Sequence, residues 1–164
     1  MNIQPSSKVT PFLWFDTQAE AAATFYVALI PNSRIVDVAY WRDGAPFPAG
    51  SVMSVTFELD GHPYIALNAG THYKLTPAFS LFVSCEDQAE VDHYWSALTA
   101  NGGRPDQCAW LTDKFGVSWQ IVPKALGRLL SDPDAGRASR AMQAMLSMQK
   151  IDVAALERAA AGPH

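Results

Sequence analysis

The sequence predicts an α+β fold built from two tandem βαβββ modules and a helical tail. Three observations support this: the same order of strand, helix and further strands occurs twice, the two stretches align residue by residue, and the pattern beyond residue 124 is purely helical. The 164 residues suit one ordinary domain. We expect a single domain over 1–164, with module one at about 8–70, module two at about 77–124 and the tail at 125–164.

The internal repeat depends on short matches that keep the same order. Gln18-Ala19-Glu20 recurs as Gln88-Ala89-Glu90, a shift of 70 residues that also aligns Phe12 with Phe82. At the hairpins the shift is 55 residues, since Gly61 to Tyr64 corresponds to Gly116 to Trp119. The smaller shift is expected if module two lacks the Pro- and Gly-rich loop at 42–50, a candidate lid in module one. A repeat of this length indicates two paired modules and not a solenoid.

Module one begins with an apolar, aromatic run at 9–15, which predicts a buried strand. Asp16 or Thr17 is expected to cap a helix that continues to Ile30. Asp60-Gly61 predicts a tight hairpin turn. The strands expected in the rest of the module are 34–41, 51–59 and 62–68.

Module two contains the most informative stretch, a hairpin at 108–122 that follows a strand at 79–85 and a helix at 87–101. Asp113 to Gly116 predicts a type I turn with Gly116 at positive φ in a three-residue loop, the Asp113 carboxylate accepting from the turn's own amides. This register places Trp110 opposite Gln120 and Cys108 opposite Val122. It also directs Trp119 toward the helices, and a one-residue slip would exchange the two tryptophans.

The tail is expected to form three helices. The first covers 124–130, the second starts at Pro133 behind Asp132 and runs to about Gln149, and Asp152 caps the last. Met142, Met145 and Met148 form an apolar stripe. This stripe either packs on the sheet or on a second subunit, or it lines a Met-rich ligand groove.

Composition excludes several classes of function. The formal net charge is -4 and no basic patch stands out, which argues against nucleic-acid binding. No apolar run approaches the roughly 20 residues that span a bilayer. Residues 1–8 lack the apolar segment of a signal peptide, and two cysteines in such a chain favour reduced thiols. We therefore expect a cytoplasmic protein that binds neither nucleic acid nor membrane.

The sequence resembles the PhnB-like branch of the vicinal oxygen chelate superfamily, which includes glyoxalases, bleomycin-resistance proteins and extradiol dioxygenases. The resemblance covers about 8–124 plus tail residues 145–156, and it depends on Phe25-Tyr26 and on the hairpin Trp110-Leu111-Thr112-Asp113-Lys114-Phe115-Gly116-Val117-Ser118-Trp119-Gln120-Ile121. It implies sheets that curve around a cavity, helices outside and a homodimer.

Members of this branch often carry the label 3-demethylubiquinone methyltransferase. A nucleotide-fold methyltransferase needs a Gly-rich turn after the first strand of a parallel sheet. The corresponding stretch here, Phe15 to Gln18, contains no glycine. The sequence therefore disfavours methyl transfer.

The resemblance also implies where a divalent metal would be held in related enzymes, by His and Glu from the first and last strands of each module. Carried over, these positions fall at or beside Thr10 and Ser80, at Ile65 or Ala66, and at Gln120. Only Gln120 could ligate, and a single neutral amide does not hold zinc, iron or nickel. His62, His72, His93 and His164 are not spaced to replace the missing ligands. We expect no metal and no other cofactor.

The ligand-binding candidates share a place on or beside the inner strands: Gln120, Trp110, Cys108, Asn68, Trp14, Ser80 and Thr10. Gln120 either bonds within the sheet or orients a ligand, because a buried amide needs partners in both cases. Trp110 is either core or a stacking wall. Cys108 has no activating base nearby in sequence and is either an inert thiol or a nucleophile.

Three functions follow from these candidates. The leading one is a metal-independent small-molecule binding protein, by analogy with bleomycin-resistance proteins. The second is a divalent-metal-dependent lyase or dioxygenase whose ligands come from a partner subunit or from His62 and His72. A thiol reaction at Cys108 is the third, and the sequence leaves open whether the protein is an enzyme.

Overall fold

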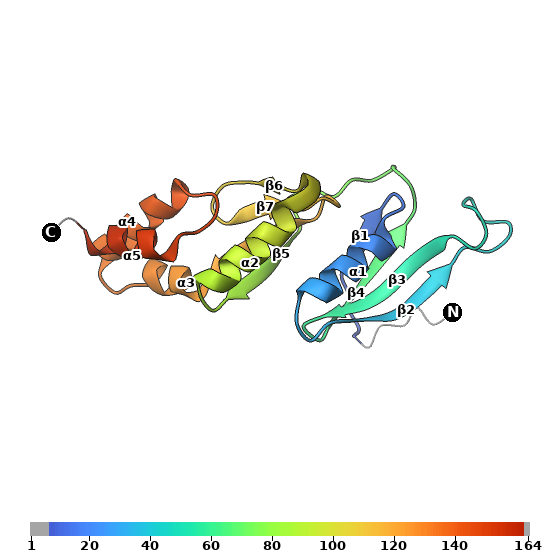
Figure 1. Cartoon of the computed structure of the whole chain (residues 1–164), viewed down its shortest axis with the longest axis horizontal. Coiled ribbons are helices and arrows are strands. Elements are labelled where there is room, and N and C mark those ends of the chain that lie inside the picture. Colours follow the sequence, from blue (N-terminus) through green and yellow to red (C-terminus); the bar gives the residue numbers. More distant parts are fainter. Residues whose placement is uncertain (1–6, 163–164) are drawn as a thin grey trace. The chain divides into compact units, whose positions relative to one another are not determined.

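The computed structural model describes residues 7–162, and the chain divides into two compact units, with the boundary between Leu75 and Thr76. Unit one contains module one. Unit two contains module two and the tail (Figure 1). The single domain expected over 1–164 stays a prediction.

Unit one is a four-stranded mixed sheet with one helix on a single face (Figure 1). Its sheet order is β1-β4-β3-β2, with β1 parallel to β4 and the other neighbours antiparallel. Its elements are β1 (Phe12–Phe15), α1 (Ala19–Leu29), β2 (Arg34–Tyr40), β3 (Val52–Leu59) and β4 (His62–Asn68). The strand predicted at 9–15 is therefore shorter than expected, since it begins at Phe12.

Unit two repeats this arrangement and adds three helices. Its sheet order is β5-β8-β7-β6, again with the first pair parallel and the others antiparallel. The module comprises β5 (Ser80–Cys85), α2 (Gln88–Thr99), a 3-10 turn η1 (Ala100–Gly102), β6 (Arg104–Pro105), β7 (Trp110–Thr112) and β8 (Ser118–Pro123). The tail comprises α3 (Lys124–Leu130), α4 (Ala135–Leu146) and α5 (Val153–Ala161).

The register of the parallel strand pairs confirms the internal repeat. Phe12 pairs with Ile65 in unit one, and Phe82 pairs with Gln120 in unit two. The shift of 70 relates the two phenylalanines and the shift of 55 relates their partners, as the sequence predicts. The α+β fold class with tandem βαβββ modules and a helical tail is therefore confirmed.

Small residues let α1 pack closely on its sheet. Ala19, Ala22 and Ala23 are fully buried, and Tyr26 reaches past them to Phe57, with 6.4 Å between ring centroids. In unit two the corresponding helix uses larger side chains, and the fully buried Trp119 lies on the helix-facing side of β8. The predicted face of Trp119 is confirmed, which fixes Gln120 on the opposite face.

The helix starts differ in two places from the sequence prediction. α1 starts at Ala19, and no side chain of Asp16, Thr17 or Gln18 caps it. Instead, Asn68 Oδ1 at the end of β4 accepts from the Ala19 amide at 2.8 Å. In the tail, Asp134 caps α4 in place of Asp132, because its carboxylate accepts from the amides of Gly136 and Arg137.

The tail helices surround a small apolar core that also takes in the end of the second sheet. The core residues are Ala109, Leu126, Leu129, Ala141, Ile151, Leu156 and Ala160, with Val122, Met145 and Met148 packed against them. Two of the three methionines therefore pack against this core, while Met142 is exposed. Asp152 caps α5 by accepting from the Ala155 amide at 2.8 Å, as expected.

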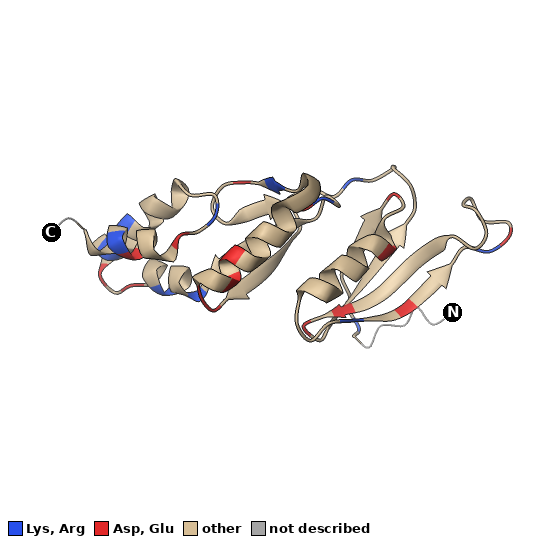
Figure 2. Ribbon diagram, in the orientation of Figure 1, with Lys and Arg blue, Asp and Glu red and all other residues tan. Residues whose placement is uncertain are grey.

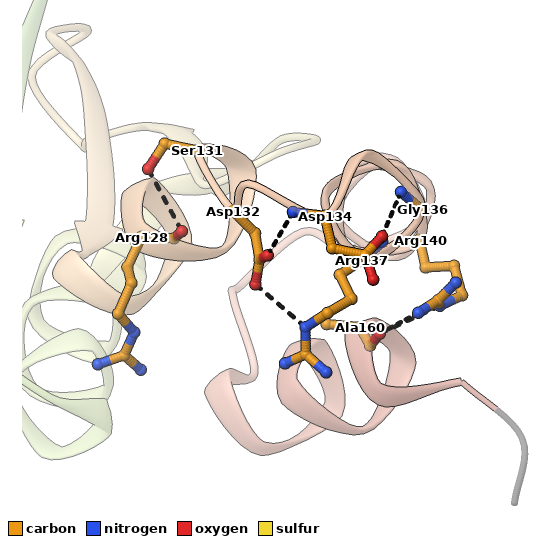
Figure 3. A network of polar contacts seen from close by, with 8 residues as sticks. All are labelled: Arg128, Ser131, Asp132, Asp134, Gly136, Arg137, Arg140 and Ala160. Atoms are coloured by element: carbon orange, nitrogen blue, oxygen red, sulfur yellow. Dashed lines mark hydrogen bonds and ion pairs between the residues drawn. The ribbon is translucent and has the colours of Figure 1, made fainter.

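A polar network joins the tail helices around the core (Figure 3). Arg140 donates two bonds to the Ala160 carbonyl, at 3.1 and 2.7 Å, and so ties α4 to the last turn of α5. Asp132 accepts from the Asp134 amide and from Arg137 Nε. These two donors, the amide first, lower the pKa of Asp132 below its ordinary value.

Charges of both signs are interspersed along the ribbon in both units (Figure 2). Between residues 7 and 162, no helix is long and apolar enough to cross a membrane.

Candidate functional site

The β7–β8 hairpin is held by the carboxylate of Asp113, which is 3% exposed. Asp113 Oδ1 accepts from the amides of Phe115 and Val117 at 2.8 and 3.0 Å. Gly116 has φ 91° and donates its amide to the Asp113 carbonyl. The predicted turn and the role of Asp113 are confirmed. The sequence missed a further partner, Trp119, whose Nε1 donates to Asp113 Oδ2 at 2.8 Å.

Gln120 lies half-buried on the sheet face away from α2, opposite Trp110 and beside Phe82. Its Nε2 donates to Ser80 Oγ at 2.9 Å. Three of the predicted site residues, Gln120, Ser80 and Trp110, therefore share one surface. We name the surface that they form with Phe82 the Gln120 face.

The Gln120 face combines neutral polar groups with aromatic surface. Phe82 is 60% exposed and Trp110 is half-buried, which offers apolar contact beside the amide. Ser118, paired with Ser80, has a buried hydroxyl without a hydrogen-bond partner among the described residues. Sequence reasoning missed Phe82 and Ser118, although alternation places Ser118 on the face of Gln120 in β8 and Phe82 on the face of Ser80 in β5.

Cys108 does not lie opposite Val122, so that prediction is wrong. The strand pairing stops at Trp110, and Cys108 and Ala109 adopt positive φ values of 56° and 73°. Their amides donate to the carbonyls of Met148 and Gln149, at 2.8 and 2.9 Å. The Cys108 thiol contacts the Met145 carbonyl at 3.8 Å, so Cys108 faces the tail.

Thr10, Trp14 and Asn68 belong to unit one. Thr10 precedes β1, so it is not on the strand face expected for it, and its hydroxyl lies 3.4 Å from the Ser7 carbonyl. Trp14 donates its Nε1 to the Gly70 carbonyl at 2.8 Å and meets Tyr73 edge-to-face at 4.9 Å. The Thr10 hydroxyl and the Trp14 indole therefore both have hydrogen-bond partners within unit one.

Asn68 is buried, and both ends of its amide are bonded. Its Oδ1 accepts from the Ala19 amide and its Nδ2 donates to the Val52 carbonyl at 3.1 Å. Asn68 thereby joins the end of β4 to the start of α1 and the start of β3. It also borders a pocket of about 300 Å³ in unit one.

The family-implied metal does not match the residues at the corresponding positions. The positions carried over from the family offer two hydroxyls, at Thr10 and Ser80, and one neutral amide, at Gln120, whose Nε2 donates to Ser80 Oγ. Ile65 and Ala66 offer no side-chain ligand. Over the described range 7–162, no three His, Cys, Asp or Glu side chains gather closely enough to hold a metal ion. Divalent metals need several imidazole, thiolate or carboxylate donors, so this donor set does not fit one.

The two cysteines are free and differ in environment. Burial, followed by the Glu90 and Asp87 carboxylates, raises the pKa of Cys85 to about 12. Iodoacetamide at pH 8 should therefore modify Cys108 alone in the native protein and both thiols in denaturant, as read by intact mass. Native alkylation of Cys85 at a rate similar to Cys108 would contradict this assignment.

The raised pKa of Cys85 also makes the stability of the fold depend on pH. A raised thiol pKa means that the folded state holds this proton more tightly than the unfolded state. The contribution of Cys85 is complete below the unfolded pKa of about 8.5 and is lost as the pH rises toward about 12. The free energy of unfolding should therefore fall between these two pH values.

The comparisons with known proteins agree with this geometry. The family described as 3-demethylubiquinone-9 3-methyltransferase matches residues 7–122. The chain belongs to this family. The PhnB protein from Bacillus cereus is 32% identical, with a TM-score of 0.65 over 71% of this chain and 99% of that one. The predicted PhnB-like resemblance is thereby confirmed.

A second solved structure supports the fold alone. Protein PA1353 from Pseudomonas aeruginosa is 19% identical, with a TM-score of 0.58 over 72% of this chain and 98% of that one. No curated protein matches the sequence.

Proposed function

We propose that this PhnB-like protein binds a small planar or hydroxylated molecule on the Gln120 face without using a metal. The observation that carries the proposal is the Gln120–Ser80 hydrogen bond beside the exposed Phe82 ring. A primary amide can donate and accept at once, so it can orient a ligand carbonyl or hydroxyl while the aromatic rings contact its plane.

The fold argues against the methyl-transfer reaction in the family's description. Nucleotide-fold methyltransferases bind their cofactor at the carboxyl ends of a parallel sheet, on a Gly-rich turn. Here each sheet has one parallel pair, and the turn from β1 to α1 has no glycine. We therefore do not assign methyl transfer to this chain.

The alternative is a metal-dependent lyase or dioxygenase that takes ligands from a partner subunit. We expect purified protein to contain less than about 0.1 equivalent of zinc, iron, nickel or manganese, since stable sites need several charged or imidazole donors. Elemental analysis measures this. A stoichiometric ion bound through His or Glu would overturn the proposal, and activity on hemithioacetals or catechols would favour the alternative.

Binding on the Gln120 face can be tested with catechol, 4-hydroxybenzoate and benzamide as probes. We expect at least one probe to shift the Trp110 indole resonance in NMR titrations. Gln120→Ala should weaken its binding about three- to tenfold, the cost of one or two hydrogen bonds. Gln107→Ala, at an exposed glutamine outside the Gln120 face, is the matched control. Equal effects of the two variants, or no shift with any probe, would contradict the site.

We also propose a homodimer in the cytoplasm. Met142 and Leu146 are exposed one turn apart on α4, which offers apolar surface for a second copy. Sedimentation velocity should give twice the chain mass of 17.9 kDa, and Leu146→Glu should return the monomer. A monomer at all concentrations would contradict this proposal.

A further inference from the structure

Unit one contains a second site, and we propose that it binds a small organic cation with an apolar or aromatic body. The site is the pocket of about 300 Å³ described above, between the start of α1, the 42–50 loop, the start of β3 and the end of β4. We name it the Trp41 pocket. Its lining residues are Asp16, Thr17, Glu20, Trp41, Phe47, Pro48, Ser51, Val52 and Asn68. It lies in a different unit from Gln120, so it is separate from the Gln120 face.

The aromatic wall comes from the loop that module two lacks. Trp41 and Phe47 stack with 5.0 Å between ring centroids and 29° between planes. Two backbone bonds close the loop: Trp41 N donates to the Ser51 carbonyl and Gly50 N donates to the Trp41 carbonyl, both at 2.9 Å. The loop is therefore a closed element that presents its rings to the pocket.

The floor of the pocket is fixed by Asn68. Because both ends of its amide bond the backbone, the first turn of α1 and the start of β3 keep their spacing. Asn68 thus acts as a positioning residue here. A pocket with a rigid floor and a loop as its wall suits a small ligand, and its volume is at the lower end for such sites.

The Trp41 indole supplies an unused donor. Its Nε1 is buried and has no hydrogen-bond partner among residues 7–162. A buried donor without a partner costs free energy because it has lost its hydrogen bonds to water. A ligand acceptor that bonds to this N–H would remove that cost. Because this N–H is covered in the free protein, a ligand acceptor must displace the atoms over it to reach the donor.

The charge of the lining selects the class of ligand. Asp16 and Glu20 carry two carboxylates on the rim, and the lining contains no Lys, Arg or His. The positive end of α1 offsets only about half a charge. A cation gains from both carboxylates and from the faces of Trp41 and Phe47, whereas an anion is repelled.

A matched set of probes tests this inference. Tyramine carries an ammonium, a ring and a hydroxyl acceptor. Phenethylamine lacks the hydroxyl, 4-ethylphenol lacks the charge, and 3-(4-hydroxyphenyl)propanoate reverses it. We expect tyramine to bind best and the propanoate worst by NMR titration. The Trp41 indole resonance, assigned by its loss in Trp41→Phe, should move downfield with tyramine and not with phenethylamine.

Substitutions in the pocket lining distinguish the contribution of charge to ligand binding from that of the aromatic rings. Asp16→Asn with Glu20→Gln should weaken tyramine about two- to tenfold, the range for two exposed charge pairs, and leave 4-ethylphenol within about twofold. Asp60→Asn with Asp106→Asn makes the same change in net charge at two exposed carboxylates outside the pocket lining and is the control. Trp41→Phe should weaken tyramine about three- to tenfold.

Several outcomes would overturn the inference. If tyramine and the propanoate bind with equal affinity, the pocket does not prefer cations. If the two double variants weaken tyramine binding equally, the ligand does not bind beside Asp16 and Glu20. If tyramine leaves the Trp41 indole resonance unchanged, the ligand does not accept a hydrogen bond from Trp41. Gln120→Ala should leave tyramine binding unchanged, so failure here and failure on the Gln120 face are distinguishable.

Discussion

Replacing Asp113 by alanine is expected to lower the free energy of unfolding of unit two by about 3–5 kcal/mol, because three N–H donors lose a buried charged acceptor at once. These donors are the Phe115 and Val117 amides and Trp119 Nε1. Asp113→Asn should cost less than the alanine change. It keeps an oxygen for the turn amides and loses the acceptor for the indole.

Urea denaturation followed by tryptophan fluorescence measures this effect. Asp106→Ala is the matched control, since Asp106 is exposed and, among residues 7–162, its carboxylate accepts from the adjacent Gln107 amide alone. Its cost should stay below about 1 kcal/mol. Similar costs for Asp113→Ala and Asp106→Ala would show that the carboxylate does not organise the hairpin.

Leu156→Ala should produce the second large loss, about 2–5 kcal/mol, which is the usual cost of a large-to-small change in a packed core. Leu156 is fully buried among Leu126, Leu129 and Ile151 in the tail core. That core also contains Ala109, which the tail holds at positive φ. The variant should therefore also raise the alkylation rate of Cys108.

Leu146→Ala provides the same chemical change at an exposed position of α4. Its cost should stay within about 0.5 kcal/mol when measured on dilute protein. Chemical denaturation and timed alkylation give both readouts. If Leu156→Ala unfolds at the same urea concentration as wild type, the tail does not contribute to the stability of unit two.

Local patterns predicted the parts of the fold that local physics determines. β4 spans His62–Asn68 and α3 spans Lys124–Leu130, both as the sequence predicts. Their signals are a tight Asp-Gly turn and an apolar run that changes from period two to helical spacing. The pairing of Trp110 with Gln120 also followed from one turn, because loop length fixes hairpin register.

Partners that are distant in sequence explain what was missed. No residue near position 18 indicates that Asn68 supplies the acceptor at the start of α1. Likewise, Cys108 leaves its strand because carbonyls 40 residues later accept from its amide and from that of Ala109. The unpaired indole of Trp41 is also visible only in three dimensions. Among the predicted site residues, Gln120 and Ser80 are brought into contact by one strand pair, whose parallel register follows from the repeat.

The hydrogen bonds from the Cys108 and Ala109 amides to tail carbonyls affect the order in which the two units can fold during synthesis. Every hydrogen bond described for unit one joins residues before Leu75, so unit one can form while the rest is being translated. Unit two needs Met148, Gln149 and the core residues up to Ala160 before its short strand β7 is secured. We expect protease resistance on stalled ribosomes to appear early for unit one and only after full-length synthesis for unit two.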